Sequence, residues 1–168
     1  LKGIYQTRNK QTILCAVEQL RESLDISEEN IKEGFAHVCE LTGLMGRWQT
    51  LQTNPLVICD TGHNLAGWEF LAPQIKDTYS SLNTHHASLS NSSLRIVFGM
   101  VDDKDINAVM SLLPSDAVYY FCQASTHRAI PADRVLATAA EHKLSGKVFC
   151  TVADAYEEAM ADANQSDF

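Results

Sequence analysis

The chain has 168 residues, of which 45% are hydrophobic and 20% are charged, a composition typical of one globular domain rather than a disordered segment. Its net charge of −8 argues against a nucleic-acid partner, because phosphate backbones need clustered Lys and Arg side chains. No apolar run approaches the roughly 20 residues that cross a bilayer, so no membrane partner is expected either. A small anionic ligand is compatible with the charge, since a few local cations can hold one.

The first part of the chain predicts two helices. Residues 9–24 carry apolar side chains on one helical stripe, and Asn9 is a candidate N-cap. A second helix is expected after Ser27, a favoured N-cap residue that precedes two glutamates in the first turn. Gly43 and Gly46 then interrupt the helical pattern.

From residue 56 onwards, short apolar runs that predict strands alternate with segments that have helical spacing. This alternation predicts an α/β fold, with a Rossmann-like, mostly parallel sheet, helices on both faces and a helical segment before it. Pro73 should kink the first of these helices or mark a local restart of it. Residues 80–93, rich in Ser, Asn and His, predict an exposed loop. The expected strands are Leu56–Cys59, Leu94–Val101, Ala117–Cys122 and Lys147–Val152, and the expected helices begin near Leu65, Asp105, Pro131 and Asp154.

The chain has five cysteines, none of which shows the close pairing of a zinc site. Three of them fall in apolar, strand-like runs, so buried reduced thiols in a cytoplasmic protein are expected. They are Cys15, Cys39, Cys59, Cys122 and Cys150.

Ligands of open parallel sheets bind beyond the carboxyl ends of the strands, which directs attention to the turn Asp60-Thr61-Gly62-His63-Asn64. A histidine just before a helix gains little structurally, and Gly62 allows the backbone to approach a ligand closely. Asn64 can cap the helix that follows. We therefore favour a functional role for this turn, whereas helix capping is the simpler reading of Asp105 and Asp154. The same edge is expected to carry Asp102, Asp103, Lys104, His127 and Arg128.

Several common site motifs are missing from the sequence. There is no G-x-G-x-x-G for a dinucleotide and no G-x-x-x-x-G-K-[ST] to cradle a phosphate. Ser125 and His127 lack the G-x-S-x-G elbow of a nucleophilic triad. The pair His85-His86 lacks matched ligands, so no metal site is predicted.

Longer motifs occur in order along the chain. Gly3-Ile4-Tyr5-Gln6 is followed by Asn9, and Gly46-Arg47-Trp48-Gln49 is followed by the strand that leads into Asp60-Thr61-Gly62-His63-Asn64. Ile96–Asp105 contains glycine and then Asp-Lys-Asp, and His127-Arg128-Ala129 comes last. Together they resemble the C-terminal domain of folylpolyglutamate synthases, within the Mur ligase superfamily. The resemblance implies that residues 1–43 are the tail of an N-terminal ATP-binding domain with linker helices. Residues 44–168 would be the Mur ligase C-terminal domain, truncated before its last strand.

The resemblance also implies an activity. The full-length protein would be a cytoplasmic ATP-dependent ligase that adds L-glutamate to folate through an acyl phosphate, and it would also act on dihydropteroate if it is a dihydrofolate synthase. ATP and Mg²⁺ would be needed by the whole enzyme and held with the N-terminal ATPase domain of the same chain. Residues 1–168 alone would hold neither and would be inactive.

Residue roles follow from the same resemblance. Gln6 and Asn9 would lie near the adenine, Arg47 would contact the ATP phosphates, and Asp60 would contact the ribose. His63, with Arg47, would act at the catalytic cleft, close to where glutamate attacks. Cationic or polar contacts to an anionic substrate would come from Asn64, Lys104 and Arg128.

The chain departs from the family pattern at a few positions. Thr61-Gly62 stands where the family more often has Gly-Ala, and Met45 stands where a proline is common. The phosphate loop and magnesium ligands of the family's first domain are absent from the sequence. Two alternatives therefore stay open, namely the C-terminal domain of a different Mur-type amide ligase and a stand-alone binding module without catalysis.

Overall fold

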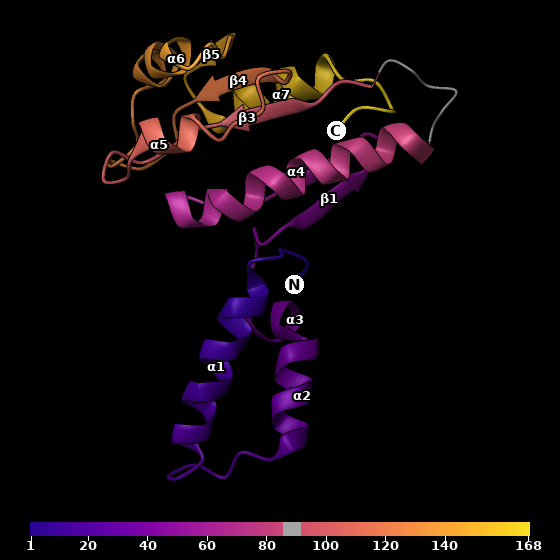
Figure 1. Cartoon of the computed structure of the whole chain (residues 1–168), viewed down its shortest axis with the longest axis vertical. Coiled ribbons are helices and arrows are strands. Elements are labelled where there is room, and N and C mark those ends of the chain that lie inside the picture. Colours follow the sequence, from indigo (N-terminus) through magenta and orange to yellow (C-terminus); the bar gives the residue numbers. More distant parts are fainter. Residues whose placement is uncertain (86–91) are drawn as a thin grey trace. The chain divides into compact units, whose positions relative to one another are not determined.

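The computed structural model of the chain describes residues 1–85 and 92–168. The chain divides into two compact units. The first unit comprises residues 1–50 and 58–61, and the second comprises residues 51–57 and 62–168. Figure 1 draws the helices and strands of both units.

The first unit begins with the helices α1 (Gln6–Leu20), α2 (Glu28–Ala36) and α3 (Val38–Thr42). Ser27 is the N-cap of α2, as predicted, and forms a reciprocal capping box with Asn30. The Asn30 backbone N–H donates to the Ser27 hydroxyl at 3.1 Å, and the Ser27 N–H donates to Asn30 Oδ1 at 3.0 Å.

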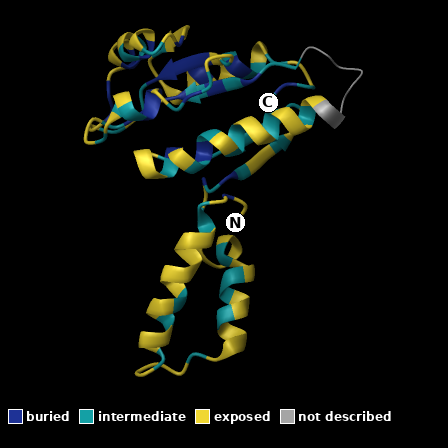
Figure 2. Cartoon of the chain, viewed as in Figure 1, coloured by how far each residue is buried: buried dark blue, intermediate teal, exposed yellow. Residues whose placement is uncertain are grey.

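The prediction for α1 is wrong at both ends. The helix begins at Gln6, with Tyr5 as its N-cap, so Asn9 lies inside the helix and is not a cap. The chain is already turning before this point, because the Gln6 backbone N–H donates to the Gly3 carbonyl at 3.0 Å. The helix ends at Leu20 rather than at residue 24. Its apolar stripe is not buried in this chain, since α1 and α2 contain no buried residue and appear largely exposed or half-buried in Figure 2.

Two short strands, β1 (Gln49–Thr53) and β2 (Leu56–Cys59), form a sheet of their own. Strand β1 was not predicted, because Gln-Thr-Leu-Gln-Thr contains no apolar run. The bounds of β2 are as predicted, but its expected place as the first strand of the parallel sheet is wrong, since its partner is β1. Every residue of β2 is half-buried, which agrees with a small two-stranded sheet rather than a strand covered on both faces.

The core of the second unit is a parallel sheet of β3 (Arg95–Phe98), β4 (Val118–Cys122) and β5 (Gly146–Phe149), in that order. Both strand pairs are parallel, which confirms the predicted fold class. The central strand β4 is almost fully buried from Tyr119 to Cys122. The helices of this unit are α4 (Leu65–His85), α5 (Ile106–Met110), α6 (Ala132–Glu141) and α7 (Val152–Ala161).

Side chains alternate between the two faces of β4. Tyr120 and Cys122 pack with Ala155 and Ala159 of α7, while Val97 and Phe149 lie at the edges of the same cluster. Tyr119 and Phe121 point to the opposite face, where their rings stack with centroids 5.4 Å apart. Helix α6 contacts β4 and β5 through a stripe that includes the fully buried Val135 and Ala139.

Several element ends differ from the predictions. Helix α4 continues through Ser80 to His85, so the expected loop over residues 80–93 is wrong in its first part, and Pro73 lies inside the helix. Residues 86–91, including His86, lie outside the described residues. Strand β3 is shorter than predicted and is followed by Gly99. Asp105 caps α5 as expected, with its carboxylate accepting the Ala108 N–H at 3.0 Å.

The last strand and helix also shift by a few residues. Gly146 begins β5 instead of only ending the preceding helix. A Cβ at this position would lie 2.2 Å from the Tyr119 carbonyl oxygen, so only glycine permits the close approach of β5 to β4. The cap of α7 is Thr151 and not Asp154, because the Thr151 hydroxyl accepts the Asp154 N–H at 3.0 Å.

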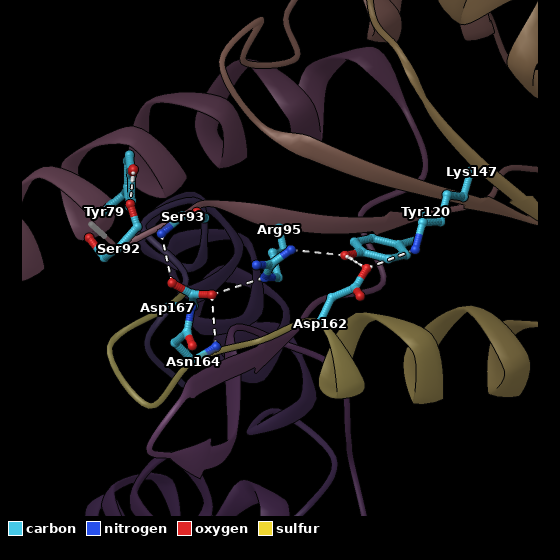
Figure 3. A network of polar contacts seen from close by, with 9 residues as sticks. All are labelled: Tyr79, Ser92, Ser93, Arg95, Tyr120, Lys147, Asp162, Asn164 and Asp167. Carbon is cyan, nitrogen blue, oxygen red and sulfur yellow. Dashed lines mark hydrogen bonds and ion pairs between the residues drawn. The ribbon is translucent and has the colours of Figure 1, made fainter.

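A polar network joins the last residues of the chain to the parallel sheet (Figure 3). Asp167, which is only 2% exposed, accepts hydrogen bonds from Arg95 Nε at 3.0 Å and from the backbone N–H groups of Ser93 and Asn164. Arg95 also donates to the Tyr120 hydroxyl at 2.9 Å, and that hydroxyl donates to Asp162 at 2.9 Å. The network lies at the amino ends of the strands, opposite the edge where ligands of such sheets bind.

The cysteines are less buried than expected. All five are free thiols, but only Cys122 is buried, and Cys59 is half-buried. The other three lie at the surface because they fall on exposed helix faces or in the turn after β5, namely Cys15, Cys39 and Cys150.

Native alkylation should separate these thiols. Burial raises the pKa of the Cys122 thiol to about 11, so at pH 8 it stays protonated as well as inaccessible. We expect iodoacetamide to modify Cys15, Cys39 and Cys150 in residues 1–168 and to reach Cys122 only after denaturation. Peptide mass spectrometry would measure this, and rapid native labelling of Cys122 would contradict the buried position of β4.

Among residues 1–85 and 92–168, no helix is long and apolar enough to span a membrane.

Candidate functional site

Asp60 follows β2 and is the centre of a polar cluster in the first unit. Its Oδ2 atom accepts the Trp48 backbone N–H at 2.6 Å and the Tyr5 hydroxyl at 2.8 Å. The two donors are 12 and 55 residues away in sequence. The carboxylate is therefore oriented from two directions by groups that the sequence pattern did not associate with it.

The backbone at Trp48 is unusual. Its φ of 49° lies in the left-handed region, which is uncommon for a bulky residue, and its side chain is only 7% exposed. Burial of the indole holds this conformation, which directs the Trp48 N–H toward Asp60. The strained residue thus serves to place a donor at the cluster.

Arg47 is held by the residues on either side of the same cluster. Its Nη1 atom donates to the Gly46 carbonyl at 3.2 Å and to the Thr61 hydroxyl. Within the described part of the chain, its Nε and Nη2 atoms have no protein acceptor, so one edge of the guanidinium can receive an anion. A planar guanidinium matches a carboxylate or phosphate through two parallel hydrogen bonds.

Gly46 brings the two segments of the cluster close together. Its carbonyl accepts the Thr61 backbone N–H at 2.9 Å and the Thr61 hydroxyl at 3.1 Å. Its φ is 68°, and a Cβ would lie 2.5 Å from the Thr61 methyl carbon. Only glycine therefore satisfies both the conformation and the close approach.

Tyr5 is the point at which the predicted nucleotide residues meet. Burial, and then the hydrogen bond to Asp60, raise the pKa of its hydroxyl to about 12, while the positive charge of Arg47 and a hydrogen bond with Gln6 act in the opposite direction. Asn9 is one turn further along α1 and donates from Nδ2 to Gln6 Oε1 at 3.1 Å. The structure thus brings Gln6, Asn9, Arg47 and Asp60 together in one unit, through a tyrosine.

His63 and Asn64 belong to the second unit, where they precede α4 and are both exposed. Asn64 acts as a helix cap, because its Oδ1 accepts the Gly67 backbone N–H at 2.8 Å. This capping bond is enough to explain why an asparagine occupies position 64, without a role in ligand binding. His63 lies on the exposed turn, one residue after Gly62, whose carbonyl accepts the Trp68 indole N–H at 3.2 Å.

Lys104 and Arg128 come together at the carboxyl ends of β3 and β4. Both donate to the same oxygen, Asp103 Oδ2, at 3.1 and 3.3 Å respectively. The loops that carry them are joined by the Asp102 N–H, which donates to the Arg128 carbonyl at 2.8 Å. Lys104, more than Arg128, lowers the pKa of Asp103. Two cations therefore flank one carboxylate, in a loop that also carries Asp102 and Asp105.

The described residues contain no group of three or more His, Cys, Asp or Glu side chains that could hold a metal ion. Tyr5 and the Trp48 amide are the members of the Asp60 cluster that the sequence did not indicate. Tyr5 could have been found from the sequence, because it stands beside Gln6 in the first motif. The backbone conformation of Trp48 could not have been predicted from the sequence.

Residues 46–168 match the protein family described as Mur ligase, glutamate ligase domain. The chain is 34% identical over 160 residues to the dihydrofolate synthase/folylpolyglutamate synthase of Escherichia coli, a match that covers 95% of this chain and 33% of that protein. It therefore spans about a third of the length of this relative.

Solved structures of folylpolyglutamate synthase/dihydrofolate synthases also match the chain. The structure of E. coli FolC in complex with DHPP and ADP matches with a TM-score of 0.68 and 30% identity, covering 95% of this chain and 34% of that one. A folylpolyglutamate synthase/dihydrofolate synthase from Yersinia pestis, complexed with AMPPNP and Mn ion, matches with a TM-score of 0.59 and 27% identity, covering 86% and 31% of the two chains.

Proposed function

Because the chain belongs to the family of Mur ligase glutamate ligase domains, we propose that it is the C-terminal part of an ATP-dependent ligase that joins L-glutamate to folate. The observation that carries the proposal is the arrangement of Gln6, Arg47 and Asp60 about the Tyr5 hydroxyl, with Asn9 hydrogen-bonded to Gln6. These residues come from two separate parts of the sequence, residues 6–9 and 47–60. They are of the types that bind a nucleotide, namely amides, a guanidinium and a carboxylate. The 34% identity to a dihydrofolate synthase/folylpolyglutamate synthase supports the same substrate class.

The proposed roles follow from the chemistry of each side chain. Gln6 and Asn9 offer amides to the adenine edge, and Asp60 accepts a hydrogen bond from a ribose hydroxyl. Arg47 presents its fork to the phosphates and offsets the negative charge that develops when the phosphoryl group is transferred. The acceptor carboxylate attacks the γ-phosphorus of ATP and releases ADP, and the amine of glutamate then displaces phosphate from the acyl phosphate.

We place the amino-acid or folate carboxylates near the second polar cluster. Lys104 and Arg128 are the cations of that cluster, and both pair with Asp103. His63 and Asn64 lie on the turn before α4 and complete the proposed substrate set, with His63 near the attacking amine. The capping role of Asn64 makes it the weakest member of this set.

The rest of the site is proposed to come from an N-terminal ATPase domain of the same chain. The helices of residues 1–43 leave large apolar side chains exposed, including Ile13 at 48%, Leu24 at 54% and Leu41 at 63%. Such side chains on linker helices suit packing against another domain. Relatives with bound AMPPNP and Mn support the use of a metal with the nucleotide, and we propose Mg²⁺, held by the other domain and the nucleotide phosphates. The free thiols are typical of a protein in the reducing cytoplasm.

The experiment that tests the proposal measures ADP formation by the full-length protein with ATP and Mg²⁺. ADP should form only when a folate, or dihydropteroate, and L-glutamate are both present, and mass spectrometry should detect a product longer by one glutamyl group. Turnover with peptidoglycan precursors instead would favour another Mur-type ligase. Nucleotide-independent folate binding without turnover would favour a binding module, and either result would overturn the proposal.

A further inference from the structure

Tyr5 occupies a position where its residue type is not explained by local structure. It is the N-cap of α1, a place that favours Ser, Thr, Asp or Asn, and it makes no side-chain cap bond. Its hydroxyl instead reaches Asp60, which is 55 residues away in sequence. A residue that breaks a local preference while making a long-range polar contact is a candidate for function.

The tyrosine ring is itself held in place. Gly3 is buried, and a Cβ added to it would lie 2.7 Å from Tyr5 Cε1, so the ring packs directly on the Gly3 backbone. The Gly3 carbonyl also accepts the Gln6 N–H at 3.0 Å, which closes the turn that starts α1. The position of the ring and the start of the helix are therefore set by the same three-residue turn.

The hydroxyl is suited to act as a permanent donor. Burial is the main cause, and the bond to Asp60 the second, of a pKa raised to about 12, so the group stays protonated across the physiological range. At Asp60 it shares Oδ2 with the Trp48 N–H. Two donors on one oxygen fix the plane of the carboxylate, and with it the direction in which a ligand hydroxyl can be received.

We propose that Tyr5 is a positioning residue of the nucleotide site, which orients the Asp60 carboxylate and ties it to the first turn of α1. The inference rests on the proposed function, because it assumes that Asp60 and the amides of that turn bind one nucleotide. Tyr5 itself touches no ligand in this account. It sets the spacing between the group that receives the ribose and the groups that receive the adenine.

The test compares ADP binding by calorimetry for the full-length protein and its variants. Tyr5→Phe removes only the hydroxyl and should weaken ADP binding by about 5- to 20-fold. This is the effect expected when a hydrogen bond to a charged group is lost and that charged group, Asp60, contacts the ligand. The KM for ATP should rise by a similar factor while kcat changes less than twofold, and the midpoint of thermal unfolding should stay near the wild-type value. Tyr79→Phe is the matched control, because its hydroxyl donates to the Ser92 backbone carbonyl, and ADP binding should not change.

Two further variants make the outcome decisive. Asp60→Asn should weaken ADP binding, and adding Tyr5→Phe to it should cause little further loss if the two side chains act together. Normal binding by Asp60→Asn would refute the nucleotide site, whereas weak binding by Asp60→Asn with normal binding by Tyr5→Phe would refute only the role of Tyr5. If Tyr5→Phe proves unstable, Gly3→Ala, which displaces the ring, should weaken ADP binding in its place, and unchanged binding there would equally overturn the proposal.

Discussion

Replacing Asp167 by alanine should lower the free energy of unfolding by about 3–5 kcal/mol, the cost of breaking a buried ion pair. The substitution leaves Arg95, whose side chain is only 15% exposed, without its carboxylate. It also strips the Ser93 and Asn164 backbone N–H groups of their acceptor. Both losses occur where water cannot fully replace the missing partner, so the effect should be large.

Chemical denaturation of the wild-type and variant proteins measures this change. The matched control is Arg21→Ala, which removes a surface pair with Glu28 and should lower the free energy of unfolding far less than Asp167→Ala does. In a double-mutant cycle with Arg95→Met, the two substitutions should show strong coupling, because the charge left behind by either one is gone in the double variant. A loss below about 1 kcal/mol for Asp167→Ala would mean that the network does not stabilise the sheet.

The second large effect is expected for Arg47→Ala in the full-length enzyme, where kcat should fall by about 100- to 1000-fold. Arg47 is the cation of the first unit that is anchored by the backbone beside Asp60, through the Gly46 carbonyl and the Thr61 hydroxyl. Its anchored edge fixes the direction of the other edge. Arg47→Ala therefore removes a positioned positive charge that would lie beside the phosphoryl group in the transition state.

Steady-state ADP formation with saturating ATP, folate and glutamate measures this effect. Arg47→Lys keeps the charge but not the planar fork, so it should recover only part of the activity. Arg134→Ala, a change on an exposed residue of α6, serves as the control and should leave kcat within about twofold of wild type. Full activity of Arg47→Ala would remove this residue from the site.

The fold class was predictable because strand and helix periods alternate clearly after residue 56. The buried β4 and the helix caps Ser27 and Asp105 were predicted from residue type alone and are confirmed. Strand β1 was not, since its polar sequence acquires strand structure only by pairing with β2. The predicted position of β2 in the parallel sheet was also wrong, because an apolar run of four residues does not specify which strand it pairs with.

The residues of the candidate site could be proposed from the sequence, but their arrangement could not. Motif resemblance indicated Gln6, Asn9, Arg47 and Asp60, whereas the hydroxyl and backbone N–H that join them depend on tertiary contacts. The positive φ of Trp48 is an example, because nothing in the sequence around a tryptophan predicts a left-handed backbone conformation. The error at Asn9 has the same origin, because the helix start is decided by the Gly3–Tyr5 turn rather than by the best capping residue.

The central claim, ATP-driven ligation through an acyl phosphate, is tested most directly by following one oxygen atom. The full-length enzyme would be given an acceptor whose carboxylate carries a heavy-oxygen label, together with ATP, Mg²⁺ and L-glutamate. If the carboxylate attacks the γ-phosphorus, one labelled oxygen must leave with the inorganic phosphate when glutamate adds. The account predicts labelled phosphate in step with glutamylated product, and unlabelled phosphate alongside product would contradict it.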